Sequence, residues 1–216
     1  MREEDIHSVI SLLRKETAKW EAPIVGRISS KDPFRVLIST LLSSRTKDDI
    51  TEKACNRLFA KADTPEKMYK LTETEIARLI YPVGFYKTKA KNIKSLCKQL
   101  LEKFGGKVPS KMESLLTLKG VGRKTASLVI TLGFQKQGIC VDTHVHRISN
   151  RLGLIKTKNP IETEKLLKAK LPSRYWRQYN KLMVSFGQHI CRPLSPFCSK
   201  CVIRTYCDRV GVKKSR

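Results

Sequence analysis

Two glycines and the residues behind them form the stretch of this sequence best suited to chemistry. The segment Leu118–Arg147 contains the run Gly-Val-Gly-Arg-Lys at residues 120–124, then an apolar stretch, then Cys-Val-Asp-Thr-His-Val-His-Arg. Glycine tolerates positive φ and lets another backbone approach closely, so Gly120 and Gly122 predict a sharp turn between two helices. A helix that begins at such a turn presents unpaired amides to a ligand, typically a phosphate. Lys124 lies in that first helical turn, and a neutral amine beside a bound phosphate backbone is a candidate nucleophile.

A second candidate site is a group of cysteines. The chain has seven, and four of them follow the spacing C-x6-C-x2-C-x5-C, at Cys191, Cys198, Cys201 and Cys207. Four thiolates this close in sequence can surround one metal centre with little further help from the fold. Zinc is one alternative, but structural zinc sites usually use two short C-x2–4-C pairs separated by a longer loop. Because only the middle pair is close here, the spacing favours a [4Fe–4S] cluster over zinc.

The charge of the chain indicates the class of partner. Its 216 residues include 44 Lys and Arg against 19 Asp and Glu, a formal net charge of +25. Such a protein is expected to bind a polyanion, with nucleic acid ahead of a membrane surface. No apolar run approaches the roughly 20 residues of a membrane span, and the mixed-charge N-terminus does not resemble a signal peptide. We therefore expect an intracellular protein, in the cytoplasm or the nucleus, whose cysteines stay reduced.

Helices are expected to position these residues, and periodicity and capping residues predict where those helices lie. Apolar residues recur at helical spacing over residues 4–19, 87–104 and 123–133, and no segment alternates convincingly with the period of a strand. Capping residues predict further helix starts at Asp32, Thr46, Thr64, Thr72, Ser110, Asp142, Asn159 and Ser173. The sequence therefore predicts an all-α fold.

The helix expected over residues 87–104 has one strongly basic face. Lys87, Lys91, Lys94 and Lys98 repeat at intervals of four, three and four residues, so their ammonium groups share one side. A solvated surface is the ordinary interpretation of such a face. Like charges at this spacing destabilise a helix unless an anion compensates them, and the net charge of +25 favours contact with phosphates.

Together these residues resemble the endonuclease III branch of the helix-hairpin-helix DNA glycosylases, over nearly the whole chain. The motifs that carry the resemblance are Leu118–Ala126, Val141–His144 and the cysteine loop. The resemblance implies a six-helix domain at residues 26–136 that contains the hairpin. It also implies a second helical domain, residues 1–25 and 137–216, that holds a [4Fe–4S] cluster.

The family's activity then supplies roles for single residues. It implies removal of oxidised pyrimidines from double-stranded DNA by a monomer, followed by cleavage of the abasic strand through β-elimination. By position, the catalytic lysine falls on Lys124 and the catalytic aspartate on Asp142. Expected DNA contacts are Arg45, Phe85, Lys87, Lys91, Gly120, Val121, Gly122, Arg123 and His144. Taken alone, Lys124 is an ordinary solvated lysine and Asp142 an ordinary helix cap, and their joint presence with the hairpin and the cysteines favours the catalytic interpretation.

Three positions depart from the family's pattern. Arg45 stands where a glutamine usually fills the hole left by the flipped nucleotide, and Phe85 stands where a leucine wedge is common. Lys119 replaces the usual proline before Gly120. Arginine can still fill a gap and donate to the opposite base, so the chemistry is kept at Arg45 while the family's preference for that base does not carry over. A phenyl ring can stack where the leucine would stand.

Other functions remain as alternatives. A mismatch-specific thymine or uracil glycosylase of the same fold is the nearest one, although such relatives commonly lack the catalytic lysine. An adenine glycosylase is disfavoured because an additional C-terminal domain is expected there. A non-catalytic iron–sulfur protein that only grips DNA would not need both Lys124 and Asp142.

Overall fold

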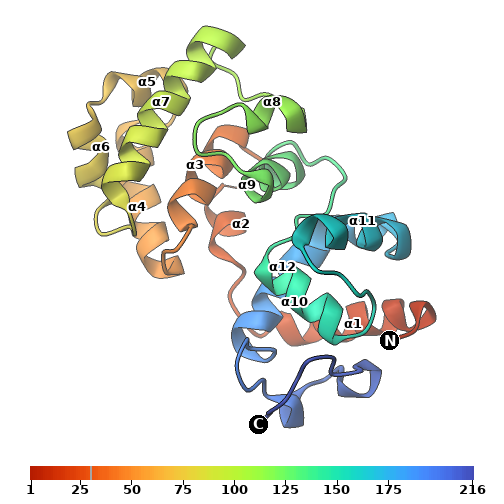
Figure 1. Ribbon diagram of the computed structural model, residues 1–216. Helices are drawn as coiled ribbons and strands as arrows, with labels where there is room; N and C mark the ends of the chain where they lie inside the picture. Colours follow the sequence, from red (N-terminus) through yellow and green to blue (C-terminus); the bar gives the residue numbers. More distant parts are fainter. Residues whose placement is uncertain (30) are drawn as a thin grey trace. The chain divides into compact units, whose positions relative to one another are not determined.

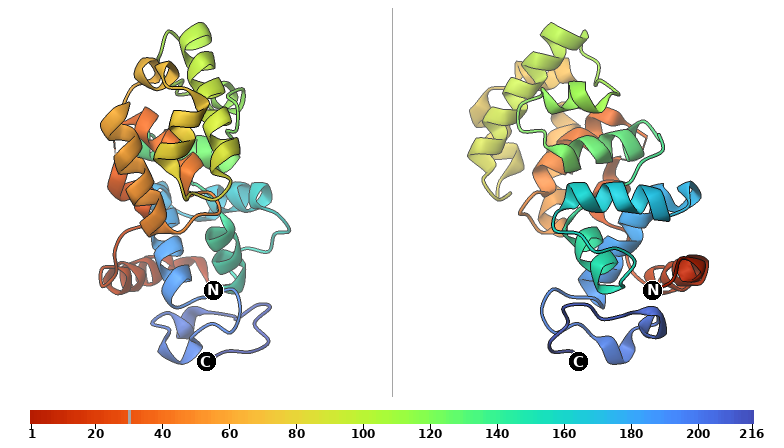
Figure 2. Two further views of the ribbon diagram at one scale, coloured as in Figure 1. Left: turned by 90° about the vertical axis from the view of Figure 1, so that its left-hand side faces the viewer. Right: turned by 45° about the vertical axis from the view of Figure 1, so that its right-hand side comes forward.

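The computed structural model describes residues 1–29 and 31–216, and the chain divides into two compact units (Figures 1 and 2). One unit comprises Ile24–Lys136, and the other comprises Met1–Pro23 together with Gln137–Arg216. Every regular element in the described residues is helical, so the all-α prediction is confirmed. No helix within these residues combines the length and the apolar character needed to cross a membrane.

The unit Ile24–Lys136 is built around one buried helix. Its helices are α2 (Ile24–Ser29), α3 (Pro33–Ser43), α4 (Asp48–Lys61), α5 (Pro65–Lys70), α6 (Glu73–Ile80), α7 (Tyr86–Phe104), α8 (Met112–Leu116) and α9 (Arg123–Leu128), and α9 continues into a π-helical turn, η2 (Val129–Gly133). Helix α3 is apolar nearly all round, and Leu37, Ile38 and Leu42 are completely buried. It contacts α2, α4, α7, α9 and η2, which form a layer around it (Figure 1).

Several helices of this unit begin at their predicted caps. The Asp32 carboxylate accepts hydrogen bonds from the amides of Phe34 and Arg35, and Pro33 occupies the first helical position of α3. Thr64 caps α5 in the same manner. Thr72 caps α6 and forms the predicted reciprocal capping box with Glu75. These starts are therefore fixed by local chemistry.

Two predicted caps in this unit are wrong. Helix α4 starts from Lys47, because the Thr46 hydroxyl instead donates to the Ser44 carbonyl and accepts the Gly84 amide. Helix α8 starts from Lys111, because the Ser110 hydroxyl accepts a hydrogen bond from Lys136. In both cases the hydroxyl that was expected to cap the helix instead forms a hydrogen bond with a residue distant in the sequence.

The second unit has a separate core. It contains a 3-10 turn η1 (Glu3–Asp5), α1 (Ile6–Thr17), α10 (Thr143–Arg151), α11 (Pro160–Lys170), a 3-10 turn η3 (Ser173–Tyr175), α12 (Trp176–His189) and two short turns, η4 (Cys198–Lys200) and η5 (Arg204–Tyr206). Helix α12 packs against α1 and α10 around the buried side chains of Tyr179 and Phe186. Asn159 caps α11 as predicted, whereas Ser173 begins a 3-10 turn and the α-helix starts later, at Trp176.

Candidate functional site

The predicted turn between two helices is confirmed at Gly120. Helix α8 ends at Leu116 and α9 begins at Arg123, and the backbone at Gly120 has φ +79°. That conformation favours glycine, and a Cβ there would lie 3.3 Å from the Asn92 side-chain nitrogen. Gly122 has an ordinary extended backbone and open space where a Cβ would stand, so the strict requirement for glycine falls on Gly120.

Helix α7 holds this hairpin in place through one glutamine. The Gln99 side chain accepts a hydrogen bond from the Lys119 amide at 2.7 Å and donates to the Thr117 carbonyl at 3.3 Å. Val121 is buried, and its amide donates to the Leu118 carbonyl. The turn is therefore attached on both sides, which gives the residues that follow it a fixed position.

Arg123 and Lys124 occupy the first turn of α9, and both are exposed. The following residues of α9, Ala126 and Leu128, are buried against the rest of the unit. The helix thus presents its basic N-terminal residues to solvent from a well-packed base. Lys124 is accessible to a large substrate such as a DNA strand.

Asp142 is the N-cap of α10, and its carboxylate is almost entirely buried. One oxygen, Oδ1, accepts the amides of His144 and Val145, both at 2.9 Å. The Asp142 residue is 8% exposed. The prediction that Asp142 caps a helix is therefore confirmed. Both amides donate to Oδ1, so the cap orients the carboxylate without using its second oxygen. Capping is therefore compatible with a further role for Asp142.

His144 lies beside a half-buried arginine that connects α10 to the cysteine loop. Arg147 approaches the His144 ring nitrogen Nδ1 at 3.1 Å and donates to the Cys191 carbonyl at 2.9 Å. Burial lowers the pKa of Arg147 from its ordinary value, although a guanidinium stays protonated at neutral pH. The start of α10 and the first cysteine are thus joined through one side chain, a link that no sequence motif indicated.

Arg45 and Phe85 are brought together in the unit Ile24–Lys136. Both are non-glycine residues with left-handed backbones, φ +53° at Arg45 and +58° at Phe85. Both side chains are exposed, Phe85 to 62%, and the guanidinium of Arg45 lies 5.7 Å from the centre of the Phe85 ring. Strained backbone conformations cluster at active and ligand-binding sites. The exposed Arg45 and Phe85 are therefore candidate contacts for a partner.

The basic face of α7 is less uniform than the sequence predicts. Lys87 and Lys91 are exposed. Lys94 instead donates to the carbonyls of Tyr69 and Leu71, the latter at 2.6 Å, and Lys98 lies 3.7 Å from the Glu102 carboxylate. The four lysines therefore do not form one continuous row of solvated ammonium groups.

The four cysteines of the C-terminal loop line one cavity. All four are free thiols that face the same cavity. Its other walls are mostly apolar and include Leu152, Phe186, Ile190, Phe197 and Ile203. Burial raises the pKa of the Cys201 thiol to about 11 and also raises that of Cys207. In the described part of the chain, no three His, Cys, Asp or Glu side chains are arranged to hold a single metal ion.

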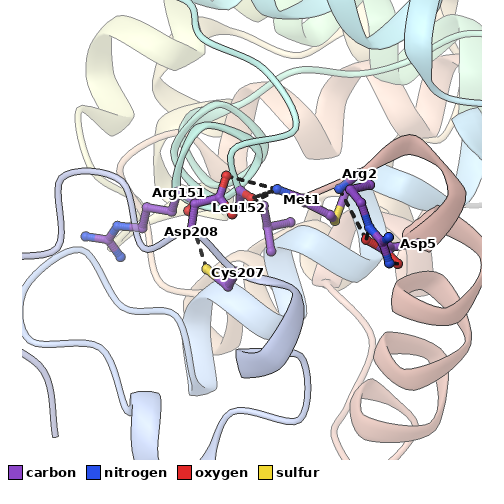
Figure 3. A network of polar contacts seen from close by, with 7 residues as sticks. All are labelled: Met1, Arg2, Asp5, Arg151, Leu152, Cys207 and Asp208. Atoms are coloured by element: carbon purple, nitrogen blue, oxygen red, sulfur yellow. Dashed lines mark hydrogen bonds and ion pairs between the residues drawn. The ribbon is translucent and has the colours of Figure 1, made fainter.

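Arg151, at the end of α10, is attached to several parts of this cavity. It donates to the Cys191 sulfur at 3.5 Å and to the carbonyls of Arg192 and Pro193. Its own carbonyl accepts the Cys207 thiol at 3.4 Å (Figure 3). Figure 3 also shows the neighbouring carboxylate of Asp208, 2.9 Å from the amino group of the first residue. These contacts fasten both ends of the cysteine loop to α10.

Comparisons with known proteins show which family the chain resembles. Residues 38–173 match the HhH-GPD superfamily of base excision DNA repair proteins. Endonuclease III from Thermotoga maritima is 50% identical over 177 residues, which cover 82% of this chain and 83% of that protein. Endonuclease III from Bacillus subtilis is 36% identical over 86% of this chain and 84% of its own length. For endonuclease III-like protein 1 from Gallus gallus, 41% identical, the chain spans 63% of the relative's length.

Solved structures give the same result. The structure of a trapped endonuclease III–DNA covalent intermediate matches with a TM-score of 0.86 at 32% identity, over 97% of each chain. A thermostable thymine-DNA glycosylase matches with a TM-score of 0.84 at 26% identity, over 95% of this chain and 96% of that one. Because these matches cover most of the chain, at 50% identity to the Thermotoga maritima protein, the chain belongs to the endonuclease III family of the HhH-GPD superfamily of base excision DNA repair proteins.

Proposed function

We propose that this base-excision DNA glycosylase and lyase removes oxidised pyrimidines from double-stranded DNA as a monomer and then cleaves the abasic strand by β-elimination. The observation that carries the proposal is Lys124, exposed in the first turn of α9 directly behind the Gly120 turn. A protein 32% identical to this chain over nearly its whole length has been trapped as a covalent intermediate with DNA. We propose that Lys124 forms such a bond in this protein, because its exposed amine can act as a nucleophile.

The chemistry divides between two residues. The Lys124 amine attacks C1′ of the damaged nucleotide, the bond to the base breaks, and the base leaves with the electron pair. Positive charge develops on the sugar as the base leaves, and the Asp142 carboxylate would stabilise that charge and assist removal of the proton from the amine. The C1′–O4′ bond then breaks as O4′ takes up a proton, so the sugar ring opens and C1′ becomes a protonated Schiff base with the lysine, which acidifies the hydrogen at C2′. Its removal expels the 3′ phosphate, and water then releases the lysine.

The hairpin and the exposed basic residues would bind the DNA backbone. Contacts through backbone amides at Gly120–Gly122 carry no sequence information, which suits an enzyme that must act wherever damage occurs. Arg123, Lys87 and Lys91 would add electrostatic contacts to phosphates. His144, half-buried against Arg147, is proposed as a further contact with the DNA strand. Arg45 and Phe85 would occupy the stack after the damaged nucleotide has been flipped out.

We assign the cavity of the cysteine loop to a [4Fe–4S] cluster. The ligands of a single zinc ion must all lie within about 2.3 Å of one point. Four thiols spread around a common cavity with apolar walls suit a centre of several atoms better. Such a cluster would bind Cys191, Cys198, Cys201 and Cys207 as thiolates and hold the loop as one structural piece. The purified protein is expected to be brown and to contain iron and sulfide, whereas a colourless protein that releases zinc would overturn the assignment.

Three DNA duplexes test the activity. The protein is incubated with DNA that carries thymine glycol, an abasic site or a G·T mismatch, in the presence of borohydride, which reduces a Schiff base to a stable bond. A covalent adduct with the first two duplexes that is lost in Lys124→Ala and kept in Lys53→Ala, an exposed lysine on α4, is the expected result. Absence of an adduct on the abasic duplex would refute the lyase.

The mismatch duplex addresses the second candidate function. A thymine-DNA glycosylase is among the matching structures, and Arg45 departs from the family's usual residue at the vacated stack. If thymine is released from the G·T duplex faster than thymine glycol from its own duplex, this protein is a mismatch glycosylase. The presence of Lys124 favours the opposite order.

A further inference from the structure

Lys89 is a half-buried lysine that the proposed reaction does not use, and it lies under the corner that carries Arg45. Its Nζ donates to three oxygens, the Leu42 carbonyl at 2.9 Å, the Ser44 carbonyl at 2.6 Å and the Thr46 hydroxyl at 3.3 Å. An ammonium group has three hydrogens, so these three acceptors use its full donor capacity. All three belong to the last residues of α3 and to the corner after it, where helix carbonyls lack partners within the helix.

The same corner is joined to the turn that carries Phe85. The Thr46 hydroxyl that accepts from Lys89 also accepts the Gly84 amide at 3.2 Å. A Cβ on Gly84 would come within 2.6 Å of the Arg45 carbonyl oxygen, so the two backbones are in direct contact. The Arg45 guanidinium then lies over the Phe85 ring. The Arg45 corner and the Phe85 turn, about forty residues apart in the sequence, are therefore connected through these contacts.

The position of Lys89 explains how that structure is held. Lys89 belongs to the first turn of α7, and the α7 cap is Phe85 itself, with the Lys89 amide bonded to the Phe85 carbonyl at 2.9 Å. The backbone of Lys89 thus fixes Phe85 while its side chain fixes the residues on both sides of Arg45. Both tips have left-handed backbones, which persist only where surrounding contacts enforce them.

We propose that Lys89 is a positioning residue that joins the Arg45 corner and the Phe85 turn into a single rigid wedge, so that both side chains enter the DNA stack together. The proposal rests on the proposed function in one respect, namely that these side chains enter DNA. Its structural part, the coupling of the two loops, concerns the protein alone and can be tested without DNA.

Lys94 provides a matched control on the same helix. It too is half-buried and donates to two carbonyls at the end of a neighbouring helix, those of Tyr69 in the last turn of α5 and of Leu71 directly after it. Neither of these carbonyls belongs to the wedge. Lys89→Met and Lys94→Met therefore remove equivalent helix-end contacts, and only the first removes the connection between the two loops.

The first measurement is hydrogen exchange of the unliganded protein. In Lys89→Met we expect faster exchange for the peptides that contain residues 43–46 and 83–86, and wild-type exchange there in Lys94→Met. Gly84→Ala, which forces the Arg45 carbonyl away, should reproduce the effect of Lys89→Met. Unchanged exchange in both the Lys89 and the Gly84 variants would overturn the coupling, whatever the enzyme does to DNA.

The second measurement compares a thymine glycol in a paired duplex with the same lesion in a single-nucleotide bulge, where no partner base has to be separated. Lys89→Met should lower kcat/KM on the paired lesion by on the order of 10- to 100-fold, as misplaced positioning groups do. On the bulged lesion it should remain close to wild type. An equal loss of kcat/KM on both substrates in Lys89→Met would overturn the wedge. So would a Lys94→Met variant whose ratio of kcat/KM on the paired and bulged lesions matches that of Lys89→Met. If wild-type protein releases neither lesion, the proposed function fails, and the exchange experiment still decides the coupling.

Discussion

Asp142 allows the structural and the catalytic roles of one carboxylate to be separated by two substitutions. It caps α10 through Oδ1, which accepts two amides at 2.9 Å, and it is the proposed catalytic carboxylate. An asparagine side chain would keep an oxygen in the place of Oδ1, and asparagine caps helices as well as aspartate does. Asp142→Asn therefore removes the negative charge alone, whereas Asp142→Ala removes both the charge and the cap.

The two variants should differ clearly in stability. Loss of an N-cap costs about 0.5–2 kcal/mol, and the upper part of that range applies because the Val145 amide is buried and would lose its acceptor. A loss of about 2 kcal/mol corresponds to a fall in Tm of about 4–8 °C for a chain of this length. Asp142→Asn should stay within about 0.5 kcal/mol of wild type.

Activity should follow the charge instead of the cap. Without a carboxylate to stabilise the developing positive charge, both variants should release thymine glycol more slowly by on the order of 10²- to 10³-fold in single turnover. Asp32 supplies the control, because it caps α3 with the same two-amide geometry, at 2.9 and 3.0 Å, and has no role in the reaction. Asp32→Ala should lose Tm and keep its rate, and Asp32→Asn should keep both.

The reasoning would be refuted by an Asp142→Asn protein with the excision rate of wild type. Asp142 would then be a helix cap and nothing more. A slow Asp142→Asn protein whose Tm had also fallen by several degrees would show that asparagine does not reproduce the cap. In that case the Asp32→Ala and Asp32→Asn proteins show whether a loss of stability by itself lowers the excision rate.

Three further outcomes are expected. Gly120→Ala should destabilise the protein by about 1–2 kcal/mol in urea denaturation, because alanine is strained at φ +79° and its Cβ approaches Asn92; wild-type stability would contradict this. Cys201→Ala should abolish the broad visible absorbance and the bound iron, and retention of both would exclude Cys201 as a ligand. Burial lowers the pKa of Lys89 to about 8 from 10.5. Between these values the folded protein binds fewer protons than the unfolded chain, so the stability of wild type relative to Lys89→Met should rise with pH over that interval, as denaturation at pH 7.5 and pH 10 would show.

The sequence predicted those features that depend on local chemistry. The all-α fold and the caps at Asp32, Thr64, Thr72 and Asn159 follow from side chains that bond to amides two or three residues away. It failed where a distant group competes for the same atom, as at Thr46, whose hydroxyl meets Gly84 across 38 positions of the sequence. The motifs also predicted Lys124 and the four cysteines as site residues, but they gave no indication of Arg151, which contacts the cysteine loop 40 or more positions away.

Helix α7 shows why such long-range contacts determine the candidate site. At its first turn Lys89 fixes the corner that carries Arg45, and ten residues later Gln99 fixes the hairpin that precedes Lys124. An α-helix rises about 1.5 Å per residue, so these two attachments are about 15 Å apart along one rigid axis. The exposed Lys91 lies on the segment between them. The residues proposed to open the DNA stack and the hairpin proposed to hold its backbone are therefore spaced by a single helix. Their separation is set by the number of residues between two side chains, neither of which takes part in the reaction.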